Sequence, residues 1–185
     1  MRAIAVSLIA SLALAGCDAS GGGAQEEAPA EAPAPSEPVA QGKVVLSADG
    51  VAAGSESFRF NAGRSEVDSA VAAVLGEPSE RSENAECGAG PVQYSTFDGL
   101  TLNYQDDKLV GWFAEGSDNI VTVDGIATGV PFTQLQGERQ AAMVEDTTLD
   151  GEFSYASADG ADIGGFVDAQ GNVASLNAGV NCFFR

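Results

Sequence analysis

The sequence contains no histidine among its 185 residues. This absence excludes Ser-His-Asp and Cys-His nucleophile systems, zinc sites with a histidine ligand and histidine-ligated haem. Carboxylate pairs, lysine bases and calcium sites remain compatible with the composition. The only lysines, Lys43 and Lys108, fall in an expected linker and at an expected turn, so a buried catalytic amine is not expected. We therefore expect a protein that is not an enzyme and that uses no cofactor.

Positive charge is also scarce. Eight Lys and Arg residues stand against 27 Asp and Glu residues, which gives a formal net charge of −19 at pH 7. Proteins that bind nucleic acid neutralise its phosphates with Lys and Arg, and these few scattered cations cannot form such a patch. An acidic surface is also repelled by anionic lipid head groups. The composition thus argues against nucleic acid as a partner and favours acidity as a source of solubility.

The N-terminal apolar run, Ala3 to Ala15, is too short to span a bilayer and has the length of a secretory signal core. It ends in Leu14-Ala15-Gly16-Cys17, which resembles the lipobox of bacterial lipoproteins. The resemblance implies that residues 1–16 are removed and that Cys17 becomes an acylated N-terminus. The acyl chains on Cys17 would hold the protein to a membrane of the bacterial cell envelope, facing the periplasm or the cell surface.

Two points about this segment stay open. Asp18, directly after Cys17, resembles the inner-membrane retention signal of some lipoproteins, but that rule varies between bacteria. The sequence therefore does not decide between the inner and the outer membrane. The alternative to the lipobox is an ordinary signal peptide followed by an incidental cysteine.

Cysteine is rare, with three in the chain. If Cys17 carries the lipid, Cys87 and Cys182 form an even pair in an oxidising compartment, which predicts a disulfide. Such a bond would close a loop of about 94 residues and stabilise the fold on the order of 4 kcal/mol in the chain-entropy model. A catalytic cysteine is the alternative, and it lacks a partner base.

Residues 17–43 have low complexity and are rich in Pro, Gly, Glu and Ala. Few of these residues could be buried, and alternating Pro and Glu keep a chain extended. We expect this segment to be a disordered tether between the lipid anchor and one globular domain at residues 44–185, which is long enough for a hydrophobic core.

The globular part is expected to contain two repeats, at about residues 44–115 and 119–185. Leu46–Gly54 matches Val121–Gly129 at a constant offset of 75, with the shared pattern Asp-Gly-(Val/Ile)-Ala-x-Gly. Asp-Gly pairs are common in turns, so coincidence is the alternative. A helical stretch and three strand-like runs follow each match. This order predicts an α+β domain made of two tandem α-β-β-β units, with helices against antiparallel sheet.

The expected helices differ in strength. In the first, Ser65 is expected to cap the N-terminus with Asp68 completing a capping box, while Gly76 and Pro78 end the helix. The second, at residues 132–143, is interrupted by Gly137. Alternating apolar residues between turn signals predict six strands, at residues 92–97, 100–104, 108–114, 152–157, 163–168 and 173–180, with residues 44–46 or 58–60 as further candidates.

The run Gly63-Arg64-Ser65-Glu66-Val67, closed by Leu75-Gly76-Glu77-Pro78, is similar to the opening of envelope lipoproteins of the BamE (SmpA/OmlA) type. Two such units in tandem look like the β-lactamase inhibitory protein fold, in which paired repeats offer a concave sheet surface to a partner. The chain departs from this pattern because its second half lacks the Gly-Pro helix ending. The resemblance implies a fold and no functional residues.

Three features are candidate sites. Glu86–Pro91 could form a backbone nest for an anion, but a tight turn that presents Cys87 is favoured. Trp112 and Phe113 are neighbours on an expected strand and so point to opposite faces. One of them belongs to the core, and the other could contact a partner unless a helix covers it. The acidic clusters at residues 146–152 and 159–162 lack the spacing of calcium loops and fall at expected turns.

These observations favour a membrane-anchored cell-envelope lipoprotein whose domain is non-catalytic and binds another envelope protein or has a structural role. One alternative is a sensor that binds a small ligand or calcium. The other is an inhibitor of a hydrolase, by analogy with the inhibitory-protein fold.

Overall fold

The structure is a computed structural model that describes residues 43–183. The expected signal peptide, the lipid anchor at Cys17 and the expected linker up to residue 42 lie outside the described residues. Within residues 43–183, no helix combines the length and the apolar character that crossing a membrane requires.

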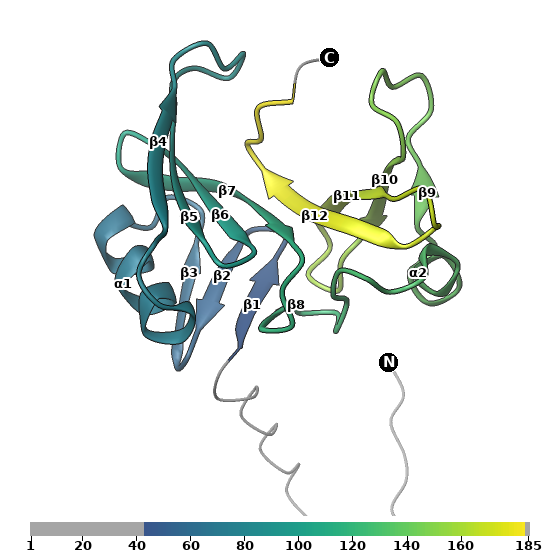
Figure 1. The fold of residues 1–185 in the computed structure, drawn as a ribbon, viewed down its shortest axis with the longest axis horizontal. Coiled ribbons are helices and arrows are strands. Elements are labelled where there is room, and N and C mark those ends of the chain that lie inside the picture. Colours follow the sequence, from purple (N-terminus) through teal and green to yellow (C-terminus); the bar gives the residue numbers. More distant parts are fainter. Residues whose placement is uncertain (1–42, 184–185) are drawn as a thin grey trace, which may run out of the picture. The chain divides into compact units, whose positions relative to one another are not determined.

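A small sheet of four strands opens the domain (Figure 1). Its order is β3-β2-β1-β8, with β1–β3 joined as antiparallel hairpins and β8 added to β1 in parallel. Buried and half-buried residues alternate along β1 and β8, as expected for a sheet with one face in the core. The strands are β1 (Val44–Ser47), β2 (Gly50–Ala53), β3 (Glu56–Arg59) and β8 (Ile120–Thr122).

A larger, fully antiparallel sheet has the order β4-β5-β6-β7-β12-β11-β10-β9. The last strand of each half of the chain, β7 and β12, pair at its centre. Its strands are β4 (Glu80–Asn84), β5 (Val92–Phe97), β6 (Leu100–Gln105), β7 (Lys108–Glu115), β9 (Ala142–Met143), β10 (Glu152–Ala156), β11 (Asp162–Val167) and β12 (Val173–Gly179).

The two helices are α1 (Arg64–Leu75) and α2 (Phe132–Arg139). Val67 and Val71 of α1 are buried, and the helix packs against β1 and β2 of the small sheet and β5 and β7 of the large one. Its end at Gly76 is as predicted, because Gly76 has a φ of 87° and its N–H donates to the Ala72 carbonyl. Its predicted start is wrong, since Gly63 is the N-cap and no side chain caps the helix.

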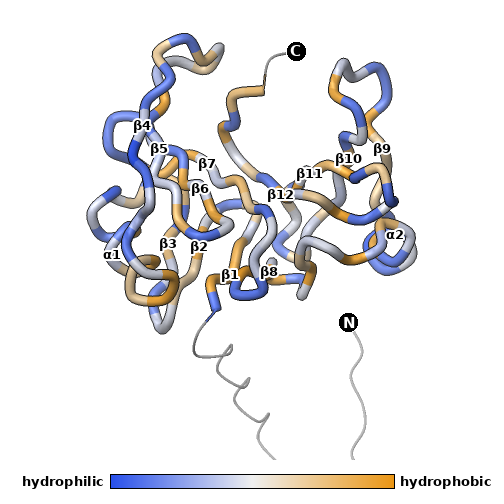
Figure 2. The backbone as a smooth tube through the Cα atoms, in the orientation of Figure 1, coloured by the Kyte–Doolittle hydropathy of each residue, from blue (hydrophilic) through white to orange (hydrophobic). Residues whose placement is uncertain are grey.

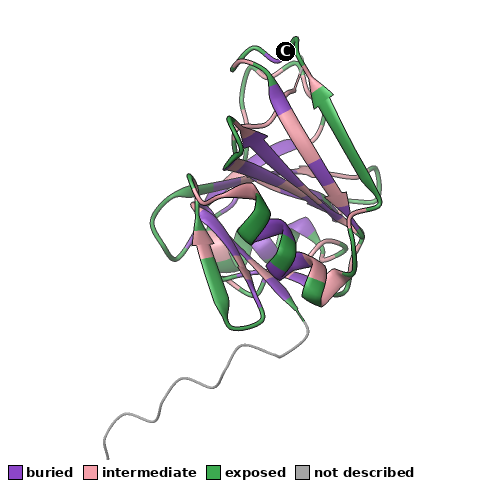
Figure 3. Ribbon diagram, turned by 90° about the vertical axis from the view of Figure 1, so that its left-hand side faces the viewer, coloured by how far each residue is buried: buried purple, intermediate pink, exposed green. Residues whose placement is uncertain are grey.

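One hydrophobic core lies between the two sheets and the helices, as the burial colours of Figure 3 show. Trp112 of β7 is fully buried there, and its indole N–H donates to the Ser47 carbonyl of β1 at 2.8 Å. This hydrogen bond ties the large sheet to the small one and satisfies the one polar group of the indole ring.

The predicted α+β class is wrong. Among residues 43–183, twelve strands form two sheets and only two short helices of 12 and 8 residues are present, so the fold is rich in β-structure. The second helix ends at Arg139 because Gln140 takes a left-handed conformation, with a φ of 56°. β1 covers the further candidate at residues 44–46 and β3 overlaps the one at 58–60, whereas β2, the polar strand β4, β8 and β9 lie outside every predicted strand.

The predicted tandem α-β-β-β repeat is wrong as well, because the two matching segments fold differently. In the first, Ala48-Asp49 forms the turn of the β1–β2 hairpin, Gly50 begins β2, and the chain continues into β3. In the second, Gly125 closes a turn by donating to the Thr122 carbonyl, and no strand follows before α2. Five strands, β4–β8, follow α1, and four strands, β9–β12, follow α2, where three were expected after each helix.

Candidate interaction face

The large sheet has one face that neither helix nor the small sheet covers. In Figure 1, α1, α2 and the small sheet lie on one side of it, whereas the β4–β5 and β9–β10 loops and the C-terminal segment rise on the other. Side chains alternate along each strand, so Trp112 faces the core and Phe113 faces the uncovered side. Trp112 is fully buried and Phe113 is partly exposed. We call this side the open face; Ser175 and Glu152 on it are nevertheless buried, at 5 % and 8 % exposure.

The register of the strands shows which residues share this face. Residues directly opposite each other across a sheet point to the same side. Two rows of such partners cross the centre of the sheet: the first runs Glu80, Thr96, Thr101, Phe113, Asn177, Gly164 and Ser154, and the second runs Glu115, Ser175, Phe166 and Glu152.

Three phenylalanines form an aromatic cluster on the open face. Phe183, near the chain's end, packs edge-on against Phe113 with ring centroids 6.1 Å apart and against Phe166 with centroids 5.2 Å apart. Such T-shaped contacts add about 0.5–1.5 kcal/mol beyond the area they bury. All three rings remain partly exposed. Partly exposed aromatic groups that are held rigidly are typical of the centres of protein interfaces.

The C-terminal segment that carries Phe183 crosses the sheet at Gly111. A Cβ atom at Gly111 would lie 2.4 Å from the Val180 carbonyl oxygen, so only glycine permits this approach. Asn103 donates from Nδ2 to the Val180 carbonyl at 2.7 Å and to Asn181 Oδ1 at 3.0 Å. Asn103 Oδ1 is the one buried side-chain polar atom of residues 43–183 without a hydrogen bond.

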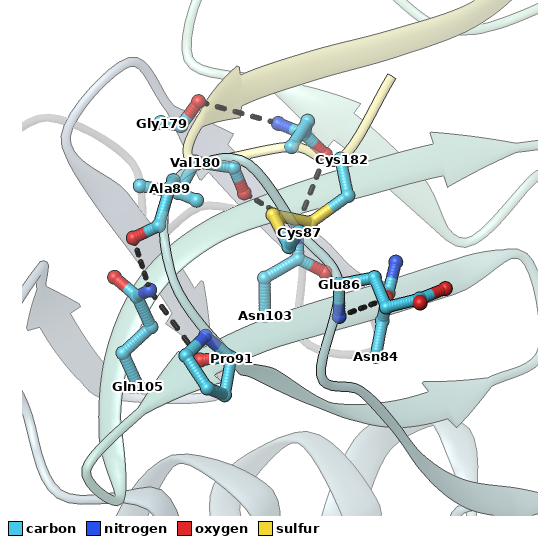
Figure 4. Close-up of a disulfide and its surroundings, with 11 residues drawn as sticks. Asn84, Glu86, Cys87, Ala89, Pro91, Asn103, Gln105, Gly179, Val180 and Cys182 are labelled. Carbon is cyan, nitrogen blue, oxygen red and sulfur yellow. Dashed lines mark hydrogen bonds between the residues drawn. A yellow bond between two sulfur atoms is a disulfide. The ribbon is translucent and has the colours of Figure 1, made fainter. Parts of the chain in front are cut away.

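A disulfide joins this segment to the β4–β5 loop, consistent with the pairing expected from the cysteine count. Cys87 and Cys182 have Cα atoms 5.4 Å apart, and the bond lies close to Asn103 (Figure 4). The Glu86–Pro91 run forms a turn, the interpretation favoured from the sequence. Gly90 N–H donates to the Cys87 carbonyl, and the Ala89 and Pro91 carbonyls accept from Gln105.

The acidic clusters lie at turns, as the sequence predicted. Asp159 accepts hydrogen bonds from the backbone N–H groups of Ala48 and Ala161, and Glu152 accepts from the Thr147 hydroxyl. No group of three or more Cys, Asp or Glu side chains within residues 43–183 is arranged to hold a metal ion.

On the opposite side of the sheet, Asp68 is the centre of a buried polar network. Its Oδ1 accepts from the Tyr104 hydroxyl at 2.8 Å. Its Oδ2 accepts from the Ser95 hydroxyl at 2.9 Å and from Arg81 at 3.0 Å, with Arg64 Nε at 3.7 Å. The Arg64 guanidinium lies over the Tyr104 ring, 5.0 Å from its centroid. The network therefore fastens α1 to β4, β5 and β6.

A groove of about 970 Å³ lies beside α1, with Arg64, Asp68 and Arg81 among its lining residues. Lys108, which begins β7 directly after the expected turn, also lines this groove. Lys43, the other lysine, donates a hydrogen bond to the Asp118 carbonyl. Ser95 is fully buried, and its hydroxyl is held by Asp68 and Arg64. These contacts indicate that the network around Asp68 stabilises the fold.

Alkaline pH is expected to unfold the domain in step with the ionisation of two of its three tyrosines. Burial raises the pKa of Tyr155 to about 12 from its ordinary value of 10, and burial together with the hydrogen bond to Asp68 raises the pKa of Tyr104 further. Because the folded state holds these groups neutral, their contribution to stability is complete below pH 10 and is lost as the pH rises towards 12.

The measurement is tyrosinate absorbance and circular dichroism followed in one pH titration. Most of the absorbance rise should coincide with the loss of secondary structure, and Tyr155→Phe should remove one tyrosine from that step. Ionisation of all three tyrosines while the circular dichroism is unchanged would show that Tyr104 and Tyr155 are accessible.

Comparison with known proteins gives no relative from which a function could be taken: no family model, no curated protein and no solved structure matches the chain. The similarity to BamE-type lipoproteins therefore stays an expectation from short motifs.

Proposed function

We propose that the protein is a membrane-anchored cell-envelope lipoprotein whose domain is non-catalytic and binds another envelope protein through the open face. The observation that carries the proposal is the partly exposed cluster of Phe113, Phe166 and Phe183 at the centre of a sheet face that no helix covers. Aromatic groups fixed on a rigid sheet bury a large area at little entropic cost when a partner docks. The lipobox ending in Cys17 supports the envelope location.

Loss of one aromatic group from the open face should abolish capture of the partner. The full chain, purified in detergent and used as bait in envelope extract, should retain a specific protein that Phe166→Asp reduces at least tenfold, as expected for an interface hot spot. Val123→Asp is the matched control, because Val123 is 48 % exposed and belongs to the chain next to β8 on the small sheet. Equal capture by all three baits, or a loss with Val123→Asp alone, would contradict the proposal.

The anchor has its own test. Mass spectrometry of the protein from membranes should find that the chain begins at Cys17 and carries acyl groups. Cys17→Ser should leave the signal segment uncleaved, because lipoprotein processing depends on the modified cysteine. The control Cys87→Ser/Cys182→Ser should be processed normally. A mature protein without lipid, in normal amount, from Cys17→Ser would show that the segment is an ordinary signal peptide.

A further inference from the structure

The positive charges of residues 43–183 lie away from the aromatic cluster. None of the six Lys and Arg residues belongs to the two rows that cross the open face. Lys108, at the start of β7, is about 16 Å along the strand from Phe113. The other five are bound elsewhere in the domain, Lys43 by a backbone carbonyl and the arginines by carboxylates of Asp49, Asp68 and Asp124: Lys43, Arg59, Arg64, Arg81 and Arg139.

Carboxylates surround the same cluster. Glu80 begins the row that contains Phe113, and Glu115 begins the row that contains Phe166. The β4–β5 and β9–β10 loops that rise on this side, in which Figure 2 shows hydrophilic stretches between apolar ones, add four more. These six side chains belong to exposed residues, and none forms an ion pair with a Lys or Arg of residues 43–183: Glu80, Glu86, Glu115, Glu145, Asp146 and Asp150.

We propose that the open face binds a positively charged protein segment, an inference that rests on the protein-binding function proposed above. Lys and Arg side chains of the partner would pair with the carboxylates at the rim, and its apolar or aromatic groups would meet the phenylalanine cluster. The electrostatic pattern and the aromatic centre are separate observations, and both fit the same kind of partner.

Both the aromatic cluster and the carboxylates of the open face suit a positively charged partner. A cation over a phenylalanine ring is attracted by the negative potential of the ring face, so Arg and Lys are compatible with the cluster itself as well as with its rim. Unpaired carboxylates at a rim steer an oppositely charged partner and disfavour an acidic one. The acidic loops at the two edges of the open face therefore favour a positively charged partner, while the aromatic cluster supplies the contact that is buried on binding.

Random short peptides displayed on phage and selected on the full chain would test the inference. The most frequent peptide, once synthesised, serves as the probe, and its dissociation constant is measured by fluorescence anisotropy at low and high salt. Glu115→Lys/Glu145→Lys reverses charge at the open face, and Glu56→Lys/Glu77→Lys is the matched control with the same change in net charge on exposed residues of β3 and after α1. Phe166→Asp reports whether a peptide uses the aromatic cluster.

We expect selected peptides rich in Lys and Arg that bind about tenfold more weakly to Glu115→Lys/Glu145→Lys and to high-salt samples, with little change in the control. Peptides that depend on Phe166 but carry no excess positive charge would overturn this inference and leave the proposed function intact. Equal weakening by both charge-reversed pairs would overturn it too, since it would show attraction to net charge alone. If no peptide depended on Phe166, both proposals would fail.

Discussion

Replacing Asp68 with alanine is expected to lower the free energy of unfolding by about 3–5 kcal/mol, as when one partner of a buried ion pair is removed. Asp68 is 7 % exposed and accepts hydrogen bonds from Tyr104, Ser95 and Arg81. Without it, the Tyr104 and Ser95 hydroxyls lose their acceptor. Arg64, whose side chain is only 18 % exposed, keeps its charge without a carboxylate nearby.

Urea unfolding followed by tryptophan fluorescence measures this loss, because Trp112 is the only tryptophan and is fully buried. The control is Arg59→Ala, which removes the exposed ion pair with Asp49, and such pairs contribute at most about 1 kcal/mol. Asp68→Asn keeps the shape of the side chain and should fall between the two. An Asp68→Ala variant as stable as Arg59→Ala would show that the network does not fasten α1 to the sheet.

The double substitution Cys87→Ser/Cys182→Ser should cost on the order of 4 kcal/mol in the chain-entropy model, because the disulfide links residues 95 apart in sequence. It should also release the C-terminal segment. Without the bond, the two hydrogen bonds from Asn103 and the ring contacts of Phe183 must hold this short segment against its conformational entropy. We therefore expect Phe183 to leave Phe113 and Phe166 when the bond is absent.

Two measurements separate these effects. Urea unfolding gives the change in stability, and carboxypeptidase digestion under native conditions reports whether the chain's end is held. Digestion should pass Cys182 in the double variant and stop before it in the oxidised protein. A variant whose end stays protected would show that the hydrogen bonds from Asn103 and the aromatic contacts hold the segment without the disulfide.

The strands with strong alternation and clear turns could be predicted from the sequence. β5, β6 and β7 lie within about a residue of their expected bounds, as do β10, β11 and β12. The pattern failed at β4, whose sequence Glu-Arg-Ser-Glu-Asn has no apolar residue and is held by its backbone pairing with β5. It failed again at the pairing of β7 with β12, since no local signal specifies which strands meet across a long connection.

The candidate face was only partly predictable. The alternation correctly predicted that Trp112 and Phe113 point to opposite sides of the sheet. It did not predict which of the two belongs to the core, because both are aromatic. Phe166 could have been found from its position in the predicted strand at residues 163–168. Phe183 could not, since it follows the last strand and is placed by the disulfide at Cys182. The role of Asp68 was missed because its partners come from distant strands.

Photo-crosslinking in living cells tests the central claim most directly. A benzophenone amino acid at position 166 or 94 would probe the open face, where Tyr94 alternates with the core-facing Ser95, and the same group at position 123 would probe the small sheet. We predict a discrete adduct with one envelope protein from positions 166 and 94 and none from position 123. Adducts only from position 123, or none from the open face at native expression levels, would contradict the account.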